Sequence, residues 1–204
     1  MRVRVDPERG VEVVLPARAP ERAAAAAVAE LTPWIERRLA DHARARQRLA
    51  GEDGSVPYLD TRLTLVAQPG RTRAHRERDF LLVPAGADAH LAIERWYRRT
   101  ARAEIAARLD NATAQVGVSY ARLTIRNQRT RWASCGSAGT MSFNWRLLLA
   151  PEDVLDYVVW HEVCHLEIAD HSPRFWALLE ARCPQWREPA AWLRKNGSAL
   201  VLSH

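Results

Sequence analysis

The sequence predicts an α+β fold in which strands and helices come first and a mostly helical half follows. The 204 residues are 48% hydrophobic and 26% charged, which is typical of a soluble globular protein. A chain of this length buries about 70% of its unfolded surface and needs no disulfide to fold. Strand-like and helix-like segments do not alternate regularly, which argues against a doubly wound sheet. We expect an N-terminal β/α region over 1–85, packed on a second unit over 86–204.

The first elements are predicted to be a hairpin and a long helical region. Residues 1–5 and 11–15 alternate charged and apolar side chains around a turn-rich spacer, the pattern of two paired strands. Residues 21–50 are predicted to be helical. We expect this region to divide in two, with Thr32 as an N-cap and Pro33 as the first residue of the second segment.

The middle of the chain is predicted to contain two strands and a second long helix. A loop rich in glycine and acidic residues covers 51–55, and strands are expected at 62–67 and 79–83. From 89 to 116 the pattern becomes helical, because apolar residues recur at a spacing that forms one stripe. The expected stripe contains Leu91, Trp96, Ile105 and Leu109.

The last third is predicted to be a small sheet followed by helices. Strands are expected at 122–126 and 140–145, joined by a loop of glycine, serine and cysteine. Helices are expected at about 151–168, 173–182 and 188–195.

Cysteine usage and hydropathy indicate the compartment. The three cysteines, an odd number at wide spacings, exclude a fully paired disulfide framework and fit a reducing environment. The N-terminus has no signal-peptide pattern, and the most apolar run, from Ala23 to Leu31, has only nine residues. A membrane span needs about 20 apolar residues. We therefore expect a cytoplasmic protein with no membrane partner.

The positive charge alone does not identify a nucleic-acid-binding protein. The net charge is +6, and all of the 30 basic residues except Lys195 are arginines. This skew, together with abundant alanine, is typical of a GC-rich coding sequence. The arginines are also dispersed and interleaved with acids, so nucleic acid is not the favoured partner.

The chemistry is concentrated in a short segment that contains His161, Glu162 and His165. Residues four apart in a helix are separated by about 400° of rotation, so both imidazoles lie on one face, one turn apart. This is the geometry of two ligands to one Zn²⁺. Glu162 is rotated about 100° from the first histidine, where it can reach a metal-bound water instead of the metal.

His171 is the candidate third ligand. In a continuous helix it would lie about 240° around the axis from His165 and face away. The chain must therefore leave the helix between Leu166 and Asp170. Pro173, preceded by Ser172 as an N-cap, predicts a new helix that begins immediately after His171.

Three other side chains near the motif have alternative interpretations. Cys164 falls about 100° around the helix from His165, on the far side from the metal, which favours a buried structural thiol over a metal ligand. Glu167 competes with His171 for the third ligand position, but its angular position favours a solvated role. Asp170 is placed to accept a hydrogen bond that orients a histidine.

Several blocks resemble the YgjP-like metallopeptidase family, in order and with the expected gaps. They are Arg131-Trp-Ala-Ser-Cys135, Gly139-Thr-Met-Ser-Phe-Asn-Trp-Arg146, Ala150-Pro151, Leu155-Asp-Tyr-Val158, His161-Glu-Val-Cys-His165 and His171-Ser-Pro-Arg-Phe-Trp176. Near the N-terminus, Val-Glu-Val-Val-Leu-Pro and Trp34-Ile-Glu-Arg-Arg-Leu39 also resemble that family. The resemblance extends over most of the chain.

The resemblance implies a zincin-like metallopeptidase domain over 86–204. It assigns the zinc to His161, His165 and His171 and the catalytic role to Glu162. The chain departs from the family pattern at Ala133, where glycine is usual, and at Asp170, where asparagine is usual. The family in turn resembles, more distantly, SprT-like proteases that act near DNA.

The favoured function is a zinc-dependent hydrolase that cleaves a peptide or protein substrate. Three neutral imidazoles leave a fourth position for water, and Glu162 would act as the general base. Arg131 and Tyr157 flank the motifs and are candidates to stabilise the oxyanion. One alternative is a metal-dependent phosphohydrolase acting on nucleoside triphosphates. Another is a DNA-associated protease or binding protein, including one in which the zinc is structural.

Overall fold

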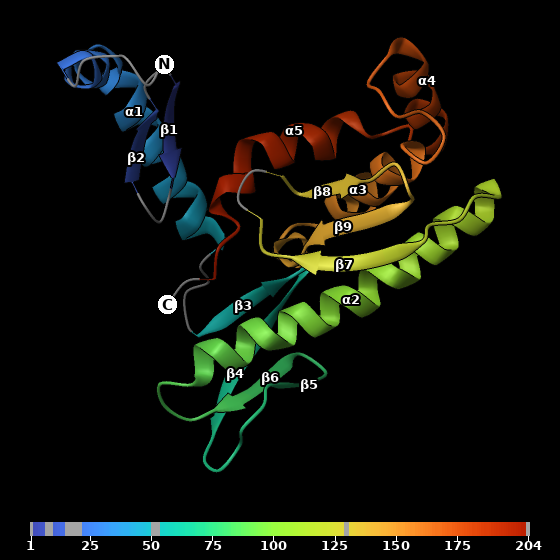
Figure 1. Cartoon of the computed structure of the whole chain (residues 1–204). Coiled ribbons are helices and arrows are strands. Elements are labelled where there is room, and N and C mark those ends of the chain that lie inside the picture. The colour runs from blue at the N-terminus through green and yellow to red at the C-terminus, as the bar shows by residue number, and fades with distance from the viewer. Residues whose placement is uncertain (1, 7–9, 15–21, 50–53, 129–130, 203–204) are drawn as a thin grey trace.

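The computed structural model describes residues 2–6, 10–14, 22–49, 54–128 and 131–202 (Figure 1). The chain begins with an antiparallel hairpin of β1 (Arg2–Asp6) and β2 (Gly10–Val14), as expected. The helix α1 (Arg22–Leu49) follows and contacts the hairpin and the C-terminal turn η2 (Gly197–Ala199). Much of the expected loop at 51–55 lies outside the described residues.

The expected division of this helical region at Thr32 is wrong, because α1 continues through Pro33. The hydroxyl of Thr32 donates a hydrogen bond of 2.8 Å to the carbonyl of Val28, one turn earlier in the same helix. The side chain is therefore used inside α1 and does not cap a new helix. A proline in a helix interior removes one backbone hydrogen bond but does not always end the helix.

A four-stranded sheet follows, in the order β3-β4-β6-β5. The sequence indicated β4 (Thr61–Gln68) and β6 (Phe80–Pro84), which pair in parallel. It did not indicate β3 (Ser55–Tyr58) or β5 (His75–Glu77), which pair antiparallel with them. These two strands have only four and three residues, too few to display an alternating pattern.

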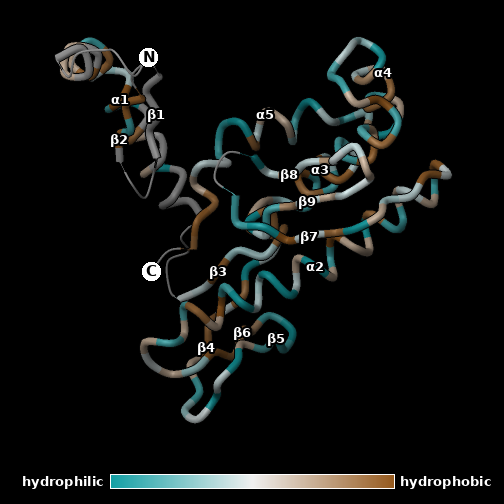
Figure 2. Tube along the Cα trace, in the orientation of Figure 1, coloured by the Kyte–Doolittle hydropathy of each residue, from teal (hydrophilic) through white to brown (hydrophobic). Residues whose placement is uncertain are grey.

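The helix α2 (Ala89–Val116) runs beside both the four-stranded sheet and the C-terminal part of the chain (Figure 1). Hydrophilic and hydrophobic residues alternate along it, as expected for a helix with one buried face (Figure 2). It ends at Gly117, which adopts the left-handed conformation with a φ of 71° and donates its N–H to the carbonyl of Thr113.

The second sheet has the strand order β7-β9-β8. The strands β7 (Arg122–Arg126) and β9 (Thr140–Asn144) pair in parallel near the expected positions. The strand β8 (Ala133–Cys135) lies between β7 and β9 in the sequence, in a segment expected to be a loop, and pairs antiparallel with β9. The short helix η1 (Trp145–Leu149) then leads into the helices α3 (Glu152–Cys164), α4 (Pro173–Arg182) and α5 (Arg187–Asn196).

One large buried cluster connects these elements. It joins Leu63 and Leu81 of the first sheet, Ile105 of α2, Phe143 of the second sheet and Leu155 of α3. The strands and helices thus come in separate groups around one core, and the expected α+β class is confirmed. Within the described ranges, no helix is long and apolar enough to cross a membrane.

The expected apolar stripe of α2 is correct for Trp96, Ile105 and Leu109 but wrong for Leu91, which is 51% exposed. In the first turn the buried side chains are those of Ala92 and Ile93, so the face that meets the core there excludes Leu91.

This difference gives a matched test on one helix. Leu109→Ala should lower the free energy of unfolding by about 2–5 kcal/mol, because it removes a fully buried side chain and leaves a cavity. Leu91→Ala should change it by less than about 0.5 kcal/mol. Urea denaturation followed by circular dichroism measures both values. Equal losses for the two variants would contradict the burial of Leu109 in the core.

Candidate metal centre

The helix α3 carries the first part of the motif, and its sequence explains where it lies. Glu152 and Asp153 occupy the first turn, where negative charge favours the helix N-terminus. Five apolar side chains bury one side of the helix in the core: Val154, Leu155, Val158, Val159 and Val163. The remaining surface places His161 and His165 toward α4.

The chain leaves α3 earlier than expected, because the helix ends at Cys164 instead of near 168. His165 is the C-cap, and a loose turn follows in which the N–H of Ile168 donates to the carbonyl of Cys164 over 3.0 Å. Nδ1 of His165 lies 2.9 Å from the carbonyl oxygen of Ile168. This contact fixes the ring with Nε2 directed away from the turn. The next helix begins at Pro173, as expected.

Three histidine side chains meet at the corner between α3 and α4. Nε2 of His171 lies 3.0 Å from Nε2 of His161 and 3.2 Å from Nε2 of His165. The ligand atoms of the three rings all lie within 4.8 Å of one another. In the part of the chain that the structure describes, this is the only group of at least three His, Cys, Asp or Glu side chains arranged to hold a metal ion.

The surroundings of His161 and His171 favour neutral imidazoles. Burial, followed by the charges of His165 and His171, lowers the pKa of His161 to about 3. Burial is also the largest cause that lowers the pKa of His171, with His165 next. Neutral rings have a nitrogen lone pair available for a metal, and protonated rings do not.

Glu162 lies beside the histidines and is 5% exposed. Its carboxylate accepts a hydrogen bond from the backbone N–H of Cys135 in β8, whereas Oε2 has no hydrogen-bond partner among the described residues. Burial raises the pKa of Glu162 to about 7, against the smaller lowering effects of Cys135 and the charge of Arg131. A buried carboxyl group that has a raised pKa and an oxygen without a hydrogen-bond partner is suited to exchange a proton.

Aromatic side chains support the histidines, a role that the sequence interpretation did not assign. Phe175, at the start of α4, is fully buried, and its ring centroid lies 4.5–4.9 Å from those of all three histidines. Trp176 stacks on His171 with centroids 5.6 Å apart. Both residues belong to the family-like segment His171-Ser-Pro-Arg-Phe-Trp176, which was the available signal for their importance.

The other side chains near the motif have structural contacts. Cys164 is buried with Phe175 and Leu179, as expected for a structural thiol. Glu167 pairs with Arg182 and is not part of the histidine group. Asp170 accepts a hydrogen bond of 3.1 Å from the backbone N–H of Ser172. The backbone carbonyl of Ile168, and not Asp170, makes the contact that orients a histidine, so that expectation is wrong.

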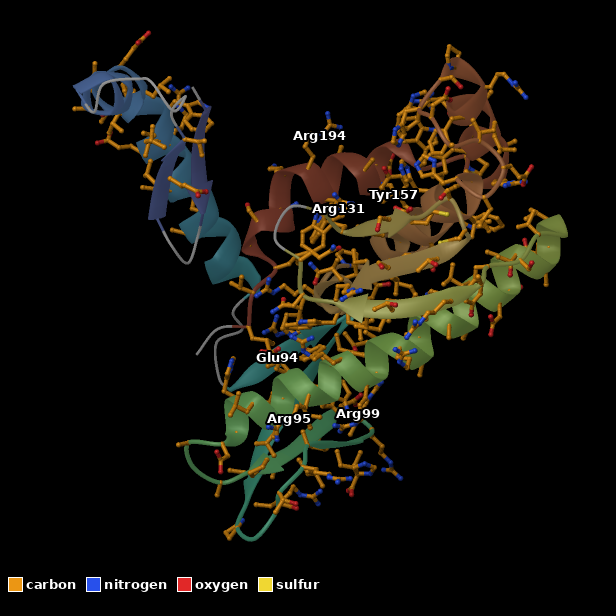
Figure 3. The ribbon with its side chains drawn as sticks, in the orientation of Figure 1. Glu94, Arg95, Arg99, Arg131, Tyr157 and Arg194 are labelled. Atoms are coloured by element: carbon orange, nitrogen blue, oxygen red, sulfur yellow. The ribbon has the colours of Figure 1, made fainter. Side chains whose placement is uncertain are left out.

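Two candidates for the oxyanion role lie near Glu162. The charge of Arg131 lowers the pKa of Glu162, and burial followed by the charge of Glu162 raises the pKa of Tyr157. Figure 3 shows Arg131, Tyr157 and Arg194 on the same side of the molecule, contributed by the segment before β8, by α3 and by α5. The positive charge of Arg131 therefore acts on the carboxyl group of Glu162.

Comparisons with known proteins found one matching family model and structures with partial similarity. A family model described as "YgjP-like, metallopeptidase domain" matches residues 1–196. The crystal structure of the metallopeptidase zymogen of Pyrococcus abyssi abylysin is 24% identical, with a TM-score of 0.40, and the match covers 45% of this chain and 93% of that chain. The zymogen of Methanocaldococcus jannaschii jannalysin is 17% identical, with a TM-score of 0.37 and coverages of 43% and 94%. Among curated proteins, no relative matches the chain.

Proposed function

Because this chain belongs to the YgjP-like metallopeptidase family, we propose that it is a zinc peptidase in which His161, His165 and His171 hold the metal and Glu162 is the general base. The observation that carries the proposal is the convergence of three Nε2 atoms on one point at the corner between α3 and α4. This convergence joins a residue of α3 and the C-cap of that helix with a third residue from beyond a turn.

The donor set suits zinc. Imidazole nitrogen is a common ligand of this metal, and a tetrahedral ion with ligands at 2.0–2.1 Å holds their nitrogens about 3.3 Å apart. The separations of 3.0 Å and 3.2 Å that involve His171 are close to this value. Three protein ligands leave one position for water or substrate, which is the arrangement of catalytic rather than structural zinc. Within the histidine group no fourth protein ligand is present.

Glu162 and its neighbours supply the proton chemistry. A zinc ion bound at this site supplies Lewis acidity, which activates water and polarises the substrate carbonyl. Glu162 accepts the proton of the attacking water at Oε2 and delivers it to the leaving amide nitrogen. The backbone N–H of Cys135 favours the ionised form of this carboxyl group, and Oε2 has no hydrogen-bond partner among the described residues. The positive charge of Arg131, which lowers the pKa of Glu162, would also stabilise negative charge that develops beside Glu162 during the reaction.

Metal removal tests the proposal. The purified protein should contain about one zinc per chain by mass spectrometry and should cleave an unfolded protein such as casein into peptides with new N-termini. Dialysis against a chelator should abolish cleavage and lower the melting temperature by several degrees, because a ligand that binds only the folded state stabilises it. Stoichiometric zinc should restore both. Metal-dependent release of phosphate from nucleoside triphosphates without peptide cleavage would instead support the phosphohydrolase alternative.

A further inference from the structure

A cleft lined by arginines lies outside the metal centre. It has a volume of about 700 Å³ and is lined by Thr72, Arg73, Ala92, Arg95, Arg98 and Arg99. Its walls come from the segment between β4 and β5 and from the first half of α2. Figure 3 shows Arg95 and Arg99 on the side of α2 that faces the four-stranded sheet, with Glu94 on the other side. The fold thus gathers four arginines that are separated into two groups in the sequence.

Two of the four guanidinium groups are held in place by contacts within the protein. Arg98 pairs with Glu94, with 2.6 Å between Nη2 and Oε1. Arg99 donates from Nη2 to the carbonyl oxygen of Ala74 over 3.3 Å, which connects α2 to the opposite wall of the cleft. Glu94 thus neutralises one arginine, and the cleft keeps about three positive charges, because no acidic side chain lines it.

The other two arginines are available to a ligand. Arg73 and Arg95 are exposed, and within the described ranges neither makes a hydrogen bond or an ion pair. The cleft also lies in a part of the chain with a positive surplus. Residues 60–102 contain nine arginines and five acidic residues, a surplus of four positive charges out of six for the whole protein. This surplus of positive charge attracts anions from distances beyond the direct contacts of the cleft.

We propose that this cleft binds the sugar–phosphate backbone of single-stranded nucleic acid. The planar guanidinium group forms paired hydrogen bonds with phosphate oxygens, and several such groups in a recessed site follow a charged backbone. A cleft between a loop and a helix admits one strand more readily than the broad surface of a duplex. No aromatic or amide side chain lines it, so binding does not depend on the identity of the bases.

The cleft is separate from the proposed hydrolytic site. None of its lining residues comes from residues 152–182, the segment from α3 to α4 that contains the three histidines and Glu162. A nucleic-acid strand bound in the cleft therefore does not occupy the proposed substrate site at the metal centre. The inference does not depend on the proposed peptidase activity, and it can be tested without measuring hydrolysis.

The test compares two double variants of the full-length protein by fluorescence anisotropy with a labelled 20-mer of thymidine, between 50 and 200 mM NaCl. Arg73→Gln/Arg95→Gln should bind at least about tenfold more weakly than the wild type. Its salt dependence should decrease by about 1.4 in slope, since each lost phosphate contact on a single strand contributes about 0.7. Arg122→Gln/Arg126→Gln removes the same charge from exposed positions of β7 outside the cleft and should weaken binding by less than about threefold.

Several outcomes would overturn the proposal. Equal weakening by both double variants would assign binding to overall charge, and no binding by the wild type at 50 mM NaCl would exclude a site. Displacement by an oligoglutamate of equal charge would indicate an acidic protein partner. Displacement by tripolyphosphate at equal phosphate concentration would indicate a pocket for small phosphate compounds. Melting curves and zinc content show whether a double variant is misfolded. If one is, the single variant Arg95→Gln replaces it and should show about half of the decrease in the salt-dependence slope of binding.

Discussion

Glu162→Gln should lower the rate of peptide hydrolysis by at least about a thousandfold while the protein keeps its full zinc content. The amide has the shape of the carboxyl group, and its oxygen can still accept the N–H of Cys135. The packing of a side chain that is 5% exposed is therefore preserved. The variant loses the ability to accept and return a proton. General acid–base catalysis typically contributes about 10²–10⁴-fold to the reaction rate.

The matched control for this variant is Glu167→Gln, the same chemical change five residues further along the chain. Glu167 pairs with Arg182 and lies outside the histidine group, so this variant should keep nearly full activity. Both variants should be measured at equal zinc content with a fluorogenic peptide that the wild type cleaves. Native rates from a zinc-loaded Glu162→Gln protein would refute the role of this residue.

His171→Ala should weaken zinc binding by at least about a hundredfold. The substitution leaves two histidines, and a site with two protein ligands does not meet the preference of zinc for at least three. His171 is exposed, so removing its ring should have little effect on the stability of the metal-free protein. The loss of affinity would therefore report a lost ligand and not a damaged core. Competition with a chromophoric chelator measures this affinity directly.

Glu167→Ala is the corresponding control, because Glu167 is the alternative third ligand in the sequence. It should change zinc affinity by less than about twofold, since its carboxylate pairs with Arg182 instead of facing the histidines. If Glu167→Ala lost zinc and His171→Ala retained it, the ligand set would have to be reassigned to His161, His165 and Glu167.

The local part of the candidate site was predictable from the sequence. His161, Glu162 and His165 lie within five residues at the end of α3, where His165 is the C-cap, and helical periodicity predicts their relative directions. The position of His171 followed from Pro173, whose fixed φ favours the first turn of a new helix. The family was also identified correctly, because its sequence blocks occur in order over most of the chain.

Short and non-local features were not predictable. The strand β8 has three residues and exists because β9 pairs with it, yet it supplies the N–H that holds the carboxyl group of Glu162. In the same way, Thr32 and Pro33 form a strong local signal for a helix start, but α1 continues through them. A pattern of a few residues cannot report a partner that lies elsewhere in the chain.

By itself, the sequence determined the fold class, the family and the directions of the two histidines on α3, because these depend on composition and on the period of a helix. Only the tertiary structure decided which groups surround them. It placed Phe175 against all three histidine rings, buried Glu162 under β8 and brought Arg73 beside Arg95 in one cleft. The physical reason is that the burial and the electrostatic surroundings of a side chain depend on distances between segments far apart in the sequence. Local sequence patterns do not determine these distances, whereas packing around one core does.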